Sequence, residues 1–304
     1  MAVPEAEIAS PINLWKRGGL SWKELGQRLW KEIQEDEVLG RGAQLAYYFL
    51  LAVFPMLLFL TALIGLFPIN TSTSSLLQYA EEILPPDAFG ILQRYLDNVV
   101  AGSGADILSL GILGALWASS SGITAIMDAL NVAYDAVETR PLWKVRLIGI
   151  LLTIGLAGFV ILSAVLVVYG GRLAEWATTY LGFGGSFELT WKLLQWPLAM
   201  ALMLLAMAII YYVCPDVEQD WRWITPGAVF AVLMWLFVSL VFKYYVAHFA
   251  NYNAAYGSIG GVIVLMLWLY LSGIVILLGG EINSEIEAAA RRHVRPGPAP
   301  QRFE

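Results

Sequence analysis

Six apolar stretches, each about 20 residues long, limit what this chain can fold into, because a helix of ~20 apolar residues crosses the hydrocarbon core of a bilayer. In a soluble helical protein most helices would carry a polar face, and the segment 147–170 has none. The sequence therefore predicts an all-α polytopic membrane protein, a six-transmembrane-helix bundle with short amphipathic helices at the interfaces. The stretches are residues 43–67, 106–131, 147–170, 191–214, 225–247 and 257–280.

The basic residues predict the orientation of this bundle. On the six-span map, fourteen of the 18 Lys and Arg residues fall on one side and three on the other, with Lys243 inside the fifth span. Short loops rich in Lys and Arg stay in the cytoplasm. Both termini are therefore expected to be cytoplasmic, as an even number of spans requires. The single cysteine, Cys214, excludes an intramolecular disulfide.

Three regions follow from this map. Residues 1–42 form a cytoplasmic N-terminal segment, in which Ser21 and Glu24 make a capping box at the start of an amphipathic helix. That helix either lies on the membrane surface or packs beneath the bundle. Residues 43–283 form the transmembrane domain, including an extracytoplasmic amphipathic segment at 68–105. Residues 284–304 are charged and Pro-rich, which predicts a disordered cytoplasmic tail.

The second span carries the most unusual pattern, a stripe of polar side chains at helical spacing. One polar side chain can join two helices, whereas several in register indicate a lined surface. A second polar stripe lies at the cytoplasmic end of the first span. Asp128 has a simpler interpretation, hydration at the helix end or pairing with Arg41. The candidate polar pathway comprises Ser120, Ser121, Thr124, Asp128, Asn131, Arg41, Gln44 and Tyr48.

Two other groups of residues are candidates for binding or packing. An outward-facing joint near residue 250 combines His, Asn and Tyr side chains, which also suit a turn at the interface. Lys243 is close enough to that interface to snorkel. A proline inside the first span predicts a kink, and a GxxxG pair permits close helix contact within or between chains. The outer-face candidates are Lys243, His248, Asn251, Asn253 and Tyr256; the hinge or packing candidates are Pro55, Gly257 and Gly261.

Signatures of enzymes are weak. His248 and His293 are the only histidines and lie on opposite sides of the predicted membrane, so they cannot share a metal. Asp128, Asp135 and Glu138 are too loosely grouped for a carboxylate site. We expect no catalytic residue, no metal or other cofactor, and no nucleic-acid partner. Glu281 and Asn283 end the sixth span, where a solvated helix end accounts for both.

Three stretches, 40–60, 116–134 and 256–283, together resemble the YihY/BrkB family of bacterial inner-membrane proteins. The resemblance covers roughly residues 20–288 and implies six spans and a bacterial plasma membrane. Many members have been called ribonuclease BN, but this chain lacks the clustered His and Asp ligands of a metal-dependent nuclease. The positions carried over by motif are Ala46, Tyr47, Tyr48, Pro55, Asn131, Tyr256, Gly257, Trp268, Gly280, Glu281 and Asn283.

The sequence leaves three functions open. The first is a transporter or exporter of a lipid-linked or amphipathic solute, with membrane lipids as partners and a homo-oligomer allowed. The second is a non-transporting organiser of the envelope that binds lipids or membrane proteins. The third, a membrane-bound ribonuclease or hydrolase, has the least support.

Overall fold

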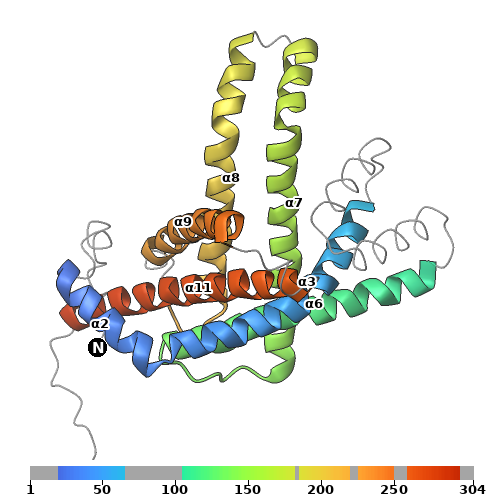
Figure 1. Ribbon diagram of the computed structural model, residues 1–304. Helices are drawn as coiled ribbons and strands as arrows, with labels where there is room; N and C mark the ends of the chain where they lie inside the picture. Colours follow the sequence, from blue (N-terminus) through green and yellow to red (C-terminus); the bar gives the residue numbers. More distant parts are fainter. Residues whose placement is uncertain (1–19, 66–104, 182–184, 220–224, 250–258, 295–304) are drawn as a thin grey trace, which may run out of the picture. The chain divides into compact units, whose positions relative to one another are not determined.

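The computed structural model describes residues 20–65, 105–181, 185–219, 225–249 and 259–294, and every regular element among them is an α-helix (Figure 1). Among the described residues, six long helices overlap the six predicted spans, and a shorter helix precedes them. They are α2 (Trp22–Glu35), α3 (Val38–Gly65), α6 (Ala105–Ala133), α7 (Leu142–Leu181), α8 (Gly185–Val213), α9 (Thr225–Phe249) and α11 (Ile259–Val294).

Within the described residues, four segments are long and apolar enough to cross a membrane, judged by length and composition. A shorter apolar stretch, Val38–Val53, lies in α3. The all-α membrane class is therefore confirmed, while the count of six crossings stays a prediction. The four segments are Leu142–Ser163, Leu193–Val213, Pro226–Val246 and Gly260–Arg291.

Several helices run past the predicted boundaries. α11 continues to Val294, so residues 284–294 are helical and not part of a disordered tail. The reason is packing: Ile286 and Ala289 are buried beside Leu25 of α2, which gives this stretch an apolar face that composition alone did not reveal. The predicted outer segment 68–105 lies almost wholly outside the described residues.

The chain divides into two compact units. One contains Met1–Ala46, Ile126–Arg140 and Met203–Glu304, and the other contains Tyr47–Ala125 and Pro141–Leu202. Helices α3, α6 and α8 each run from one unit into the other.

In the first unit, α11 packs against α9 and α2. Glycines allow the closest approach of α9 and α11: a Cβ built on Gly227 would clash with the carbonyl oxygen of Gly279 and lie 2.6 Å from Asn283 Cγ. Further along, the indole N–H of Trp235 donates to Ser272 Oγ at 3.0 Å. Small residues at such crossings let helix backbones meet, so the register of α9 on α11 is fixed by backbone contact.

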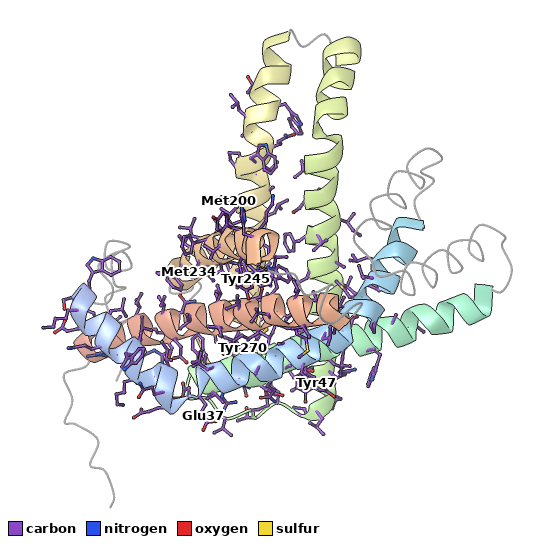
Figure 2. All side chains as sticks on the ribbon, viewed as in Figure 1. Glu37, Tyr47, Met200, Met234, Tyr245 and Tyr270 are labelled. Atoms are coloured by element: carbon purple, nitrogen blue, oxygen red, sulfur yellow. The ribbon has the colours of Figure 1, made fainter. Side chains whose placement is uncertain are left out.

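Another glycine allows close packing between helices of the same unit. A Cβ on Gly42 of α3 would lie 2.7 Å from Ile274 Cγ1 and 3.5 Å from the ring of Tyr270, which is labelled in Figure 2. The Tyr211 hydroxyl at the end of α8 donates to the carbonyl oxygen of Ile276 at 2.8 Å. α11 is thus the element on which the first unit is assembled.

The predicted capping box at the start of α2 is confirmed. Ser21 Oγ accepts from the Glu24 N–H at 3.2 Å, and the Glu24 carboxylate accepts from the Ser21 N–H at 2.8 Å. Leu25 packs against α11 beside Ile286, as the alternative of a helix packed beneath the bundle requires. Trp22, the first residue of this helix, is 76% exposed.

In the second unit, helices α3, α6 and α7 meet in a small apolar cluster of Phe59, Ala115 and Ala157. α6 and α7 also approach closely where a Cβ on Gly149 would lie 3.1 Å from Thr124 Cγ2. α3 runs without interruption through Pro55.

The close approach around α11 predicts different costs for two glycine substitutions on that helix. Gly279→Ala places a methyl group against the Tyr211 hydroxyl and 2.9 Å from Ala231 Cβ. We expect it to lower the free energy of unfolding by about 1–3 kcal/mol, the usual cost of overpacking. Gly261→Ala is the matched control, since a Cβ there meets nothing within 4 Å. Equal apparent melting temperatures of the two purified variants would contradict the close approach.

Candidate functional site

Ser120 and Thr124 belong to the part of the α6 polar stripe that lies in the second unit. This part is closely packed. Ser120 is fully buried, and its hydroxyl donates to the Trp117 carbonyl oxygen at 2.8 Å. Thr124 donates to the Ser121 carbonyl oxygen at 2.9 Å. These hydroxyls therefore bond to their own helix, and the methyl group of Thr124 packs at Gly149.

The remaining pathway candidates do not share one environment. Asp128 is exposed, and Arg41, its suggested partner, donates its Nε–H to the Asp36 carbonyl oxygen at 2.9 Å. Gln44 is exposed. The half-buried ring of Tyr48 packs edge-on against Tyr47, with 5.6 Å between ring centroids.

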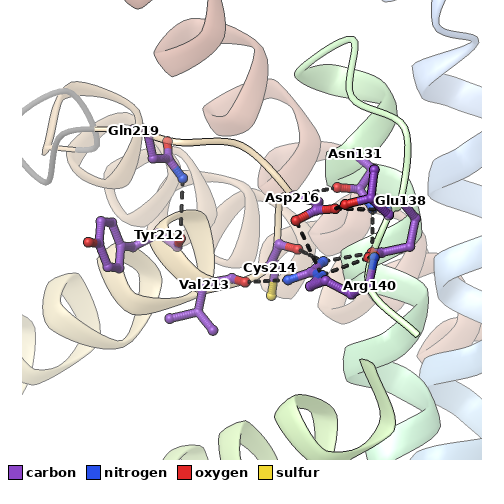
Figure 3. A network of polar contacts seen from close by, with 9 residues as sticks. Asn131, Glu138, Arg140, Tyr212, Val213, Cys214, Asp216 and Gln219 are labelled. Atoms are coloured by element: carbon purple, nitrogen blue, oxygen red, sulfur yellow. Dashed lines mark hydrogen bonds and ion pairs between the residues drawn. The ribbon is translucent and has the colours of Figure 1, made fainter. Parts of the chain in front are cut away.

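Asn131 belongs to a polar network that sequence reasoning did not foresee (Figure 3). Its amide donates to Glu138 Oε2 at 2.9 Å, and its Oδ1 accepts from the Asp216 N–H at 2.7 Å. The backbone positions it well, since α6 is followed by a left-handed residue, Asp135, with φ 50°, and the Ala136 N–H returns to the Asn131 carbonyl oxygen at 2.7 Å. Such a helix end turns the chain sharply.

Arg140 is the centre of this network. Its guanidinium donates to both oxygens of Glu138, at 2.7 and 2.6 Å, and to the carbonyl oxygens of Val213 and Cys214, at 3.2 and 2.7 Å. These hydrogen bonds hold the pKa of Glu138 below its ordinary value and raise the pKa of Arg140. The network ties the loop after α6 to the loop after α8, which is a structural role for Asn131.

The outer-face candidates are only partly described. Lys243 is exposed. His248 is exposed, stacks on Tyr244 at 4.1 Å between centroids and has Nδ1 2.9 Å from the Tyr244 carbonyl oxygen. Gly261 has no close neighbour in the described chain, so the close helix contacts occur at other glycines. The candidates Asn251, Asn253, Tyr256 and Gly257 lie outside the described residues.

Glu281 and Asn283 are not at a solvated helix end, and that interpretation was wrong. Each is 1% exposed, because α9 and α2 both cover this part of α11. Asn283 Oδ1 accepts from the Gly227 N–H at 2.7 Å. Among the described residues, Glu281 Oε1, Asn283 Nδ2 and the Tyr134 hydroxyl are buried without a hydrogen-bond partner, although such groups are normally satisfied.

The carboxyl group of Glu281 interacts with that of Asp36, which follows α2. Burial raises the pKa of Asp36, and the interaction with the Glu281 side chain works against the rise. The carboxylates of Glu32 and Asp135 also act electrostatically on Glu281. Two adjoining carboxyl groups cannot both ionise at low cost, so we expect the pair to retain one proton. Among the described residues, no group of three or more His, Cys, Asp or Glu side chains could hold a metal ion.

Long apolar helices with buried carboxyl and amide groups define an integral membrane protein. The model of the family described as "Virulence factor BrkB" matches residues 29–304, and the chain belongs to this family.

The relatives agree with that assignment. A Bacillus subtilis protein named "Putative ribonuclease-like protein YfkH" is 39% identical over 245 residues, 81% of this chain and 88% of the relative. A "UPF0761 membrane protein" of Aeromonas salmonicida is 26% identical over 260 residues, 84% of this chain and 86% of the relative. No solved structure matches the chain.

The Arg140 network predicts sensitivity to acid. Because the pKa of Glu138 is depressed in the folded protein, its contribution to stability is complete above the ordinary pKa of 4.5 and is lost as the pH falls through the folded value. Glu138→Gln removes a charge-assisted bond, so we expect a loss of about 1–2 kcal/mol at neutral pH and a smaller further loss on acidification. Apparent melting temperatures between neutral and acid pH measure both effects.

The control is Glu35→Gln, which removes an exposed ion pair with Lys31 worth about 0.5 kcal/mol. If Glu138→Gln and Glu35→Gln showed the same melting temperatures across the pH range, the Arg140 network would contribute nothing measurable to stability.

Proposed function

We propose that this chain is a transporter or exporter of an amphipathic or lipid-linked solute in the bacterial inner membrane. We further propose that the Asp36–Glu281 carboxyl pair is the group that changes its protonation during transport. The observation that carries the proposal is a carboxyl group, 1% exposed, inside the candidate span Gly260–Arg291. Ionisable side chains within spans are costly and are retained chiefly for transport of ions, protons or substrates.

The contacts around the pair fit a group that changes its protonation during a working cycle. The Glu281 carboxyl group interacts with that of Asp36, and one of its oxygens has no partner among the described residues. A purely structural carboxylate would be expected to bond an arginine or several backbone N–H groups, as Glu138 does with Arg140. Proton loss from the pair would place two negative charges side by side and favour separation of α11 from the α2–α3 junction.

The placement in the membrane follows from the charge distribution. Fourteen of the 18 basic residues lie on the side that holds both predicted termini, and basic loops remain cytoplasmic. Asp36 and Glu281 are then near the cytoplasmic end of the bundle, where protons can enter from the cytoplasm. Membrane lipids are the proposed partners, and a lipid-linked compound is the proposed substrate class.

A second candidate is favoured by a separate observation. Ser120 and Thr124 bond to their own helix and pack at Gly149, so this part of α6 is suited to holding helices together. A non-transporting organiser that binds lipids or other membrane proteins would use the chain in that way. If the chain is such an organiser, substitutions at Glu281 should leave its function unchanged.

If the Asp36–Glu281 pair changes its protonation during transport, Glu281→Gln should lose transport while the protein remains folded. The substitution keeps the shape of the side chain and removes the titrating proton, so the folded protein should be equally or more stable. We expect reconstituted vesicles to move a fluorescent phospholipid about tenfold more slowly or worse, equivalent to ~1.4 kcal/mol in the barrier. The measurement is dithionite quenching of the labelled lipid, repeated with a panel of amphipathic solutes.

Glu285→Gln is the matched control, one turn along α11, where Glu285 pairs with Arg28 at 3.2 Å. It should transport as the parent chain does. Transport by Glu281→Gln at the parent rate would remove the pair from the mechanism. Failure of the parent chain to move any compound in the panel would favour the organiser.

A further inference from the structure

We propose that Arg146, Ser121 and Trp117 in the second unit form a binding site for an anionic phosphate group, such as the headgroup of a phospholipid. The site goes beyond the proposed transport, because it would bind its ligand even if the chain moved nothing. Arg146 lies on α7 in the candidate span Leu142–Ser163, and the other two residues lie on α6.

The geometry holds the guanidinium in one place. Arg146 Nη1 donates to Ser121 Oγ at 3.3 Å, and Nη2 donates to the Trp117 carbonyl oxygen. The guanidinium carbon lies 4.0 Å from the centroid of the Trp117 ring, a cation–π distance. An arginine that merely snorkelled would extend its head group towards water, whereas this one bonds to the neighbouring helix.

The charge of Arg146 is not neutralised by its surroundings. Among the described residues, no carboxylate forms an ion pair with it or acts on it electrostatically. Its Nε is buried and has no hydrogen-bond partner there. The neighbouring arginine in the sequence, Arg140, differs in bonding both oxygens of a carboxylate. A cation with free donors in an apolar helix pair needs an anion, and the planar fork of arginine suits the oxygens of a phosphate.

Access and surroundings favour a lipid as the source of that phosphate. Trp117 is 59% exposed, and Trp143 and Leu147 of α7 are also exposed. Arg146 lies close to the start of the candidate span Leu142–Ser163, where the headgroups of a bilayer are near, and basic pockets between helices bind anionic headgroups. A phospholipid could therefore place its acyl chains against these exposed apolar side chains and its phosphate on Arg146.

The test is binding by the full chain in detergent, measured by fluorescence anisotropy with labelled phosphatidylglycerol and, for comparison, labelled phosphatidylcholine. We expect preference for the anionic lipid and a loss of affinity of about tenfold or more in Arg146→Gln, in line with the strength of charge-assisted hydrogen bonds. Lys144→Gln, which removes an exposed cation from the same turn of α7, should change affinity less than about twofold.

Arg146→Lys keeps the charge but loses the fork, so its affinity should lie between the parent and Arg146→Gln; it also covers a failure of Arg146→Gln to fold. Inorganic phosphate and glycerol phosphate are added as competitors. If they compete at millimolar concentration the ligand is a soluble phosphate, and if they do not it is the lipid. Equal affinities of Arg146→Gln and Lys144→Gln, or no preference for the anionic lipid in the parent chain, would overturn the site. This experiment measures binding and not transport. A negative result would therefore not bear on Glu281, which the transport assay tests separately.

Discussion

The close approach of α9 and α11 at Gly227 and Gly279 is the contact on which the first unit depends. With a Cβ at either position the two backbones could not meet. Because they do meet, Asn283 reaches the Gly227 N–H at 2.7 Å, and α11 is fixed in place. Glu281 lies about 200° around the helix from Gly279 and Asn283, on the side where Asp36 interacts with it, and its burial there is the basis of the proposed function.

Polar groups in this protein serve two different ends. Around Arg140 each nitrogen of the guanidinium donates to an acceptor and each carboxylate oxygen of Glu138 is bonded, as expected of a network that holds loops in place. Around Glu281 and Arg146, by contrast, buried polar atoms are left without partners in the described part of the chain. Unsatisfied groups destabilise a fold, which makes these two positions the natural candidates for binding and proton exchange.

The sequence predicted the class of fold well, since apolar length alone identifies spanning helices and the capping box located the start of α2. It predicted the site poorly. Helical spacing placed Ser120, Thr124 and Asn131 on one stripe, but spacing cannot show which neighbours cover each residue. Gly149 packs against Ser120 and Thr124. Asn131 bonds to Glu138, seven residues further on, and to Asp216, which is 85 residues away in the sequence. The burial of Glu281 was missed for the same reason, because its contact with α2 is tertiary. The one indication in the sequence that Glu281 matters was its place among the positions carried over from the family resemblance.

The proposed function requires that Asp36 and Glu281 share a single proton inside the folded protein. Infrared difference spectroscopy of the purified chain in lipid measures this directly, through the C=O stretching band of a protonated carboxyl group. At neutral pH the account predicts such a band, absent from Glu281→Gln and present in Glu285→Gln. A spectrum without the band in the parent chain, or one that Glu281→Gln leaves unchanged, would contradict it.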